Sequence, residues 1–365
     1  MRIAIIAPVF EPVPPPLYGG TERVVSVLTE ELVRRGHDVT LFASGDSSTT
    51  ARLAATRPRG LRLDPEVKDY VAATLIHAGE VYRQADTFDV IHNHVDYIAF
   101  PLARMSPVPT VTTTHGRLDL PEITRLFESF PEQHLVSISH AQREPVPHLD
   151  WIGNVYNAID LSSYHLHPEP GDYLVFLGRI CPEKRPDRAI EVALSVGMRL
   201  IIAAKVDAVD QEYYEHAIAP LIESSDLIEY IGEITEAEKD AVLGNAFASL
   251  HSIDFPEPFG LTMAEAMATG TPVIAMRRGS TPEVVSDGET GFICDSIGEM
   301  IAAVERIPEI DRRACRHRVE QHFSPATMVD GYERVYMSLV QATDTLVTEI
   351  FPADEHVMKA QALAG

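Results

Sequence analysis

Two glutamates lie eight positions apart in the segment FPEPFGLTMAEAMATGTPVI (255–274), on either side of a Phe-Gly turn. We expect this turn to open a helix, so that free backbone N–H groups and the positive end of the helix dipole face a common point. Such a point receives a phosphate or the oxygens of a sugar. Glu265, one turn into the helix, is expected to accept hydrogen bonds from a ribose diol, and Glu257 from sugar hydroxyls. The backbone groups would come from Phe259, Gly260 and Leu261.

Two cations recur at a second strand-to-helix junction. Arg179 and Lys184 are five positions apart, after an apolar run and before a helical pattern, so both side chains can converge on one anion. A diphosphate leaving group gains negative charge as its bond breaks, and fixed cations in a closed cleft stabilise that change. The structural alternative is an exposed Arg–Lys pair on a solvated loop.

Histidines form the third group of candidate residues. His115 follows the strand-like run 111–114, which suits a side chain that faces a cleft. His92, His94 and Asp96 alternate, so on a strand they share one face and could bind a metal. The chain has no D-x-D carboxylate pair that would complete a divalent-ion site. We therefore predict no metal, and a hydrogen-bonding role toward a second substrate for His92 and His94.

The elements that position these residues alternate between strand and helix. The first series begins with the apolar run Ile3–Ile6 and continues through a helical pattern to Val39–Phe42. After the proline-containing segment 165–172, the same alternation starts again at Tyr173. Two such series predict two doubly wound α/β domains with parallel sheets, and a ligand site in the cleft between them.

Composition limits the partners. The 365 residues contain 30 Lys and Arg against 54 Asp and Glu, a net charge of −24, which disfavours nucleic acid. Arginine clusters at 52–62 and 312–318 leave a peripheral membrane contact as the less favoured alternative. Three cysteines without CxxC spacing, and an N-terminal apolar run that is too short for an export signal, predict a cytoplasmic protein.

The segment 255–274 resembles the E-x7-E motif of glycosyltransferase family 4, also called glycosyl transferase group 1. The resemblance covers about residues 1–340. Further segments match the family landmarks in the same order: the glycine-rich loop YGGTE (18–22), the cleft histidine in THG (114–116), YNAID (156–160), GRICPEK (178–184), GSTPE (279–283) and DGETGF (287–292).

The resemblance implies a GT-B fold, in which two Rossmann-like domains face each other across a cleft. Residues 1–168 would form the acceptor-side domain and 169–323 the donor-side domain. A helix at about 324–345 would pack back on the first domain, before a tail at 346–365. The implied activity is retaining, metal-independent transfer of a sugar from a nucleotide-diphosphate sugar to a small-molecule, lipid or glycan acceptor, without a cofactor.

Matched residue by residue, the family assigns catalytic roles to His115, Arg179, Lys184 and Glu257. It assigns donor binding to Gly19, Gly20, Phe259, Gly260, Leu261 and Glu265. Two positions depart from the family pattern: Ala158 replaces a glycine, and Lys205 stands where many relatives have a glycine-containing loop. We expect Lys205 to be a surface residue; the alternative is an additional cation in the cleft.

Four rival functions have to be weighed. A nucleotide-sugar epimerase on the same fold would need additional acid/base carboxylates, and a sugar phosphorylase a cofactor lysine. A non-catalytic nucleotide- or glycan-binding module would not need the intact cationic pair. A dinucleotide-dependent dehydrogenase is disfavoured because no GxGxxG follows the first strand.

Overall fold

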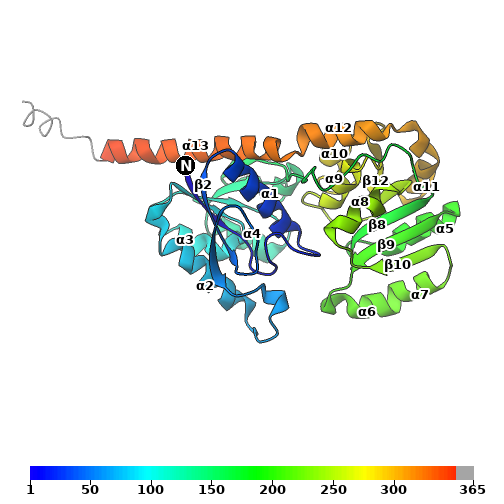
Figure 1. Ribbon diagram of the computed structural model, residues 1–365, viewed down its shortest axis with the longest axis horizontal. Coiled ribbons are helices and arrows are strands. Elements are labelled where there is room, and N and C mark those ends of the chain that lie inside the picture. The colour runs from blue at the N-terminus through cyan, green and yellow to red at the C-terminus, as the bar shows by residue number, and fades with distance from the viewer. Residues whose placement is uncertain (351–365) are drawn as a thin grey trace, which may run out of the picture.

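Two separate parallel sheets build the chain, each covered by helices (Figure 1). The computed structural model describes residues 1–350, with side chains to residue 342. The remainder of the expected tail, 351–365, lies outside the described residues. The first sheet has the order β3-β2-β1-β4-β5-β6-β7 and the second β10-β9-β8-β11-β12-β13. Both orders reverse direction beside the first strand of their domain, which is the doubly wound arrangement.

The first sheet comprises β1 (Arg2–Ile6), β2 (Asp38–Ser44), β3 (Arg52–Arg57), β4 (Val90–Asn93), β5 (Thr110–Thr113), β6 (His134–Ser137) and β7 (Trp151–Asn154). Its helices are α1 (Gly20–Arg34), α2 (Tyr70–Tyr82), α3 (Phe100–Ala103) and α4 (Pro121–Glu128). The apolar run of β1 is buried on both faces. Ile3 and Ile5 pack in the core under α1, whereas Ala4 and Ile6 pack with residues of α2 on the opposite face. This explains the absence of apolar/polar alternation in the strand.

The second sheet comprises β8 (Tyr173–Arg179), β9 (Arg199–Lys205), β10 (Ile228–Gly232), β11 (Ala248–His251), β12 (Val273–Met276) and β13 (Gly291–Cys294). Its helices are α5 (Pro186–Val196), α6 (Gln211–Tyr213), α7 (Ala219–Glu223), α8 (Glu236–Gly244), α9 (Leu261–Ala268), α10 (Thr281–Val284), α11 (Ile297–Arg306) and α12 (Arg312–His322). One continuous apolar core holds this domain together.

The C-terminal helix α13 (Pro325–Ile350) leaves the second domain and runs along the first (Figure 1). Met328, Tyr332 and Tyr336 recur every four residues on one face and are buried against the first sheet and α1. The chain therefore crosses between the domains twice. None of the helices within residues 1–350 combines the length and the apolar composition that a bilayer crossing requires.

The two crossings lie together at one corner of the molecule. The backbone N–H of Ile159, in the first crossing, donates to the carbonyl oxygen of Phe323, in the second, at 2.8 Å. The rings of Tyr156 and Phe323 make an edge contact at 5.7 Å. Glu283 joins this corner from the second domain, because its carboxylate accepts hydrogen bonds from the N–H groups of His140 and Ala141 and from the Tyr156 hydroxyl.

Candidate active site

A cavity of about 580 Å³ lies between the two domains, beyond the carboxyl ends of their central strands. The structure brings together most of the residues predicted from sequence on its walls: Gly19, Gly20, His94, His115, Arg179, Lys184, Glu257, Phe259, Gly260, Leu261 and Glu265. We call the side contributed by the second domain the donor wall and the side contributed by the first domain the acceptor wall. These names follow the predicted roles.

Lys184 and Glu257 form an ion pair on the donor wall. Burial alone would lower the pKa of Lys184 and raise that of Glu257, but their mutual attraction outweighs it and moves both values the other way. Both groups are therefore charged at neutral pH. His251, at the end of β11, lies with Nε2 3.7 Å from the Glu257 carboxylate. Burial lowers the pKa of His251 to about 4, so this imidazole is neutral.

Arg179, at the end of β8, is surrounded by carboxylates. Its guanidinium lies 3.5 Å from Asp207, 3.3 Å from Asp210 and 3.7 Å from Glu183. These separations are longer than a close charge-assisted hydrogen bond, so the carboxylates hold the guanidinium without fully occupying its donors. Arg179 thus faces the cavity as a positioned cation.

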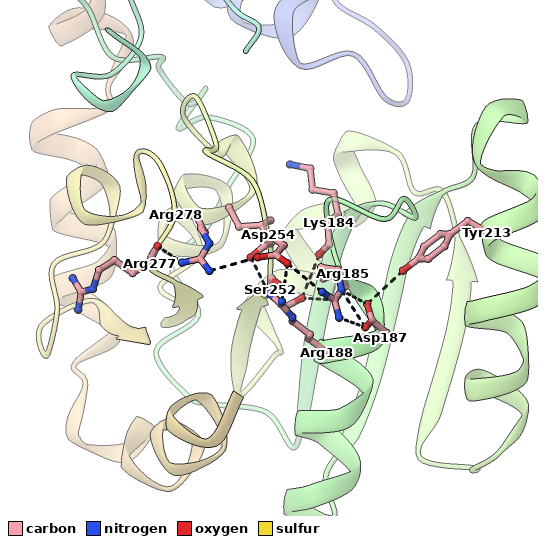
Figure 2. Close-up of polar contacts among 10 residues, drawn as sticks. Lys184, Arg185, Asp187, Arg188, Tyr213, Ser252, Asp254, Arg277 and Arg278 are labelled. Carbon is pink, nitrogen blue, oxygen red and sulfur yellow. Dashed lines mark hydrogen bonds and ion pairs between the residues drawn. The ribbon is translucent and has the colours of Figure 1, made fainter. Parts of the chain in front are cut away.

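The turn that carries Lys184 is held in an unusual backbone conformation. Arg185 has φ 52°, in the left-handed region that residues other than glycine rarely adopt. Its carbonyl accepts a hydrogen bond from Ser252 at 2.8 Å, and its guanidinium contacts Asp187 at 2.7 Å and Asp254 at 3.2 Å. Figure 2 shows Lys184 directed away from this cluster. The cluster therefore fixes the start of α5 and leaves the Lys184 ammonium to the cavity.

The loop before α9 is held by a close backbone approach. Gly279 passes so near that a Cβ there would lie 2.4 Å from the Glu257 backbone nitrogen, and Ser280 donates its N–H to the Glu257 carbonyl at 2.9 Å. Gly260, with φ 79°, precedes the first residue of α9. The GSTPE segment thus fixes Glu257 and the helix start from outside the cavity, and the first N–H groups of α9 remain available there.

Glu265 is 3% exposed and faces the cavity from α9. Its carboxylate lies 2.8 Å from the ammonium of Lys239, which also contacts Glu236 at 3.0 Å. Glu236 in turn accepts from Arg23 of the first domain at 2.9 Å. The expected ribose acceptor is therefore one end of an ion-pair chain that crosses the cleft.

The glycine-rich loop brings the first domain close to α9. At Gly19, with φ 155°, a Cβ would lie 2.8 Å from Pro15, and at Gly20 it would lie 3.1 Å from Leu261. The N–H of Tyr18 donates to Glu233 of the second domain at 2.7 Å. A side chain at Gly20 would press on Leu261 of the donor wall, and one at Gly19 would clash with Pro15 within the loop, which explains the glycine pair.

His115 and His94 form a hydrogen-bonded pair on the acceptor wall. Nδ1 of His94 lies 2.8 Å from Nε2 of His115. Burial lowers the pKa of His115 to about 4, and burial with the neighbouring histidines lowers that of His94. Both rings are neutral at pH 7, so one nitrogen of the pair donates and the other accepts.

The prediction that His92 faces the acceptor is corrected by the structure. His92 is 0% exposed and does not line the cavity. Its Nδ1 lies 2.6 Å from the Tyr336 hydroxyl of α13 and its Nε2 lies 2.8 Å from Thr113. Both nitrogens are occupied, so His92 is also unsuited to the alternative metal site. In the part of the chain that the structure describes, no three His, Cys, Asp or Glu side chains are grouped as metal ligands.

Lysines and a histidine on the donor wall were missed or misplaced by sequence reasoning. Lys205, expected at the surface, lines the donor wall; it pairs with Asp207 at 2.7 Å and lies 5.0 Å from the Tyr18 ring centroid. Lys239 and His251 carried no motif; only the position of His251 at the end of an apolar strand gave a signal. Ala158 is not among the residues with positive φ in the described chain, so alanine is compatible with its backbone there.

Comparison with family models matches both halves of the chain. The model for glycosyl transferases group 1 matches residues 160–318, and the model for glycosyltransferase family 4 matches residues 18–161. Among curated proteins, the glycogen synthase of Mycobacterium tuberculosis is 26% identical, over 89% of this chain and 92% of its own. The D-inositol 3-phosphate glycosyltransferase of Mycolicibacterium smegmatis is 24% identical, over 86% and 85%.

Solved structures share the fold. AviGT4, a glycosyltransferase involved in avilamycin A biosynthesis, superposes with a TM-score of 0.72 at 23% identity, covering 93% of this chain and 98% of its own. HepE from Anabaena, in complex with UDP and glucose, gives a TM-score of 0.72 at 17% identity, covering 93% and 100%. The arrangement of the two sheets is that of the GT-B fold, as the sequence predicts.

Proposed function

We propose that this chain, which belongs to the group 1 glycosyltransferases of family 4, transfers a sugar with retention from a nucleotide-diphosphate sugar to an acceptor hydroxyl, without a divalent metal. The observation that carries the proposal is the donor wall. Arg179 and Lys184 converge there on one cavity, next to the start of α9 and to Glu265. This combination suits a diphosphate, a ribose and a sugar in one extended ligand.

The relatives support a nucleotide-sugar donor. HepE is in complex with UDP and glucose, and a starch synthase IV domain from Arabidopsis thaliana is bound to ADP and acarbose. The curated relatives carry the names of a glycogen synthase, an N-acetylglucosaminyl malate synthase and an inositol phosphate glycosyltransferase. These names describe different acceptors, so the support for a nucleotide-sugar donor comes from the nucleotides bound in the solved structures.

In the proposed reaction, the bond between the anomeric carbon and the β-phosphate oxygen breaks, and negative charge grows on the diphosphate. Arg179 and Lys184 stabilise that charge, which makes a metal unnecessary for this purpose. The departing phosphate oxygen takes the proton of the acceptor hydroxyl, and the acceptor oxygen bonds the anomeric carbon on the same face. No protein nucleophile takes part.

The test begins with the purified protein and a panel of UDP-, ADP- and GDP-sugars, screened by thermal shift and by release of the nucleoside diphosphate. Release should persist in excess EDTA with less than a twofold change. NMR of the product should show the anomeric configuration of the donor. Activity that EDTA abolishes and Mn²⁺ restores would contradict metal independence, and an inverted product would contradict retention.

A further inference from the structure

The acceptor wall contains a buried carboxyl to which neither the sequence nor the family resemblance assigns a role. Glu22, in the first turn of α1, is 6% exposed and lines the cavity. It lies directly below the glycine-rich loop, because a Cβ at Gly19 would be 3.3 Å from Glu22 Oε2. Within the described residues, Glu22 forms no ion pair, and burial raises its pKa to about 7 against the effect of backbone N–H groups and Arg62.

Two further polar groups face the same space. Nε2 of His94 is buried and has no hydrogen-bond partner among the described residues, although the ring lines the cavity. A buried polar nitrogen without a partner costs free energy unless a ligand or water satisfies it. Asp96 also lines the cavity, and burial raises the pKa of its carboxyl to about 6. Glu22, Asp96 and Nε2 of His94 can therefore form hydrogen bonds with the hydroxyls of an uncharged ligand.

The cations on this wall are already paired. Arg62 binds Glu11 at 3.1 Å, and Arg23 binds Glu236 at 2.9 Å. Arg23 also donates to the carbonyl of Leu17 at 3.0 Å. A phosphate on the acceptor would therefore approach buried carboxyls, while the two arginines of this wall are already paired with carboxylates, which makes its binding less favourable than that of an uncharged group.

Aromatic rings complete the wall. Phe10 and Tyr70 both line the cavity and pack edge-to-face, with ring centroids 5.8 Å apart. Tyr70 is 45% exposed, so its ring is available at the mouth. A flat apolar ring beside a few hydrogen-bonding groups suits a molecule with one apolar C–H face and a rim of hydroxyls.

We propose that the acceptor wall binds an uncharged sugar, with Glu22, Asp96 and Nε2 of His94 bonding its hydroxyls and Phe10 and Tyr70 facing its ring. This inference rests on the proposed function, since it names the class of acceptor for that reaction. It excludes acceptors that carry a phosphate next to the reacting hydroxyl.

The experiment measures release of UDP from UDP-glucose, or of the nucleotide from whichever donor the panel selects. Matched acceptors are added: glucose, maltose and their monophosphates. At least one uncharged sugar should raise release about tenfold over hydrolysis, while its phosphate does not. Faster release with a monophosphate than with the uncharged sugar would overturn the proposal. So would no response to any acceptor in a protein that still binds the nucleotide. Failure to bind any nucleotide would instead contradict the proposed function.

Substitutions test whether Glu22 binds the acceptor. Glu22→Gln should raise the acceptor KM about tenfold, the size expected for losing a hydrogen bond to a charged or strongly polar group, with the donor KM within twofold. Glu22→Lys should shift the preference toward the phosphorylated acceptor. Glu30→Gln, on the same helix and bonded to Thr49 at 2.6 Å, is the matched control and should leave both constants unchanged. An unchanged acceptor KM in folded Glu22→Gln would overturn the assignment of Glu22.

Discussion

The carboxyl groups that line the two walls of the cavity are held in opposite ways. On the donor wall, Lys184 pairs with Glu257 and Lys239 with Glu265, so buried groups keep their charges through partners. On the acceptor wall, burial without such partners lowers the pKa of His115 and raises that of Glu22, so both move toward their neutral forms. The first wall is suited to an ionic ligand, and the second to an uncharged one.

The difference has a consequence for binding. A diphosphate that reaches Arg179 and Lys184 meets cations that carboxylates already hold in place, so little side-chain ordering is needed on binding. The carboxylates also compete with the phosphates, which limits how tightly the intact donor binds. The stabilisation is then greatest when the phosphate charge is greatest, as the bond breaks.

The largest effect is expected at the donor-wall cations. Arg179→Ala or Lys184→Ala should lower kcat by about 100-fold, a loss of about 2.7 kcal/mol of transition-state stabilisation, with a smaller change in the donor KM. Arg179→Lys should restore only part of the lost kcat, because lysine returns the positive charge but not the planar guanidinium that can bond two oxygens at once. Steady-state kinetics with circular dichroism measure this. Arg277→Ala, which breaks an ion pair with Asp295 at 3.0 Å away from the cavity, is the control.

A normal kcat with only a raised donor KM in these variants would contradict the role assigned to the donor wall. The donor wall would then hold the substrate without acting on the transition state. The ion pairs with Asp207 and Glu257 would be structural in that case.

A somewhat smaller effect is expected at Glu265. Glu265→Ala should weaken nucleoside diphosphate binding by about 2 kcal/mol, or about 30-fold, because a charged acceptor of two ribose hydroxyls is lost. Lys239 retains Glu236 as a partner at 3.0 Å, so folding should be preserved. Isothermal titration calorimetry measures the affinity, with Glu305→Ala on α11 as an exposed control. Unaltered affinity in the folded variant would exclude the ribose contact.

The smallest effect concerns the acceptor wall and pH. The folded-state pKa of His115 is about 4, below its ordinary 6.5, so the unfolded chain binds more protons between these values. The stability from burying the neutral ring is present above pH 6.5 and lost as the pH falls toward 4. His115→Asn should reduce this acid-induced loss in the free energy of unfolding by about 1 kcal/mol. The value is smaller than for a fully buried ring because His115 is partly exposed.

Urea unfolding at pH 7.5 and pH 5 measures the difference, with the exposed His216→Asn as the control. Identical pH dependence in wild type and His115→Asn would mean that the ring is not held neutral. The contrast between the two walls would then not extend to His115.

Most of the donor wall could be predicted from sequence because its residues lie a few positions apart in the chain. Arg179 and Lys184 flank one strand end, and Glu257 and Glu265 flank one helix start. The same holds for the two-domain architecture, since strand and helix periodicities are local. What periodicity could not supply is the partner of each charge: Lys239 reaches Glu265 from a different helix, 26 positions earlier.

The error at His92 has the same origin. Strand alternation correctly places His92 and His94 on one face, but it does not say what covers that face. Tyr336 of α13, 244 positions away in sequence, closes over His92 and leaves only His94 at the cavity. Glu22 was overlooked because a glutamate in a first helical turn is ordinarily read as a surface residue that complements the helix dipole.

The corner where both interdomain crossings meet is placed to act as the hinge between the two domains. The hydrogen bond between Ile159 and Phe323 and the three bonds accepted by Glu283 tie the two connections together, so any change in the angle between the domains would be expected to pivot at this corner. The contacts of Tyr18 with Glu233 and of Arg117 with Glu183 lie across the cleft, away from this axis. A small rotation about this corner would therefore separate those contacts, and their two ion-pair and hydrogen-bond partners would set how readily the cavity opens.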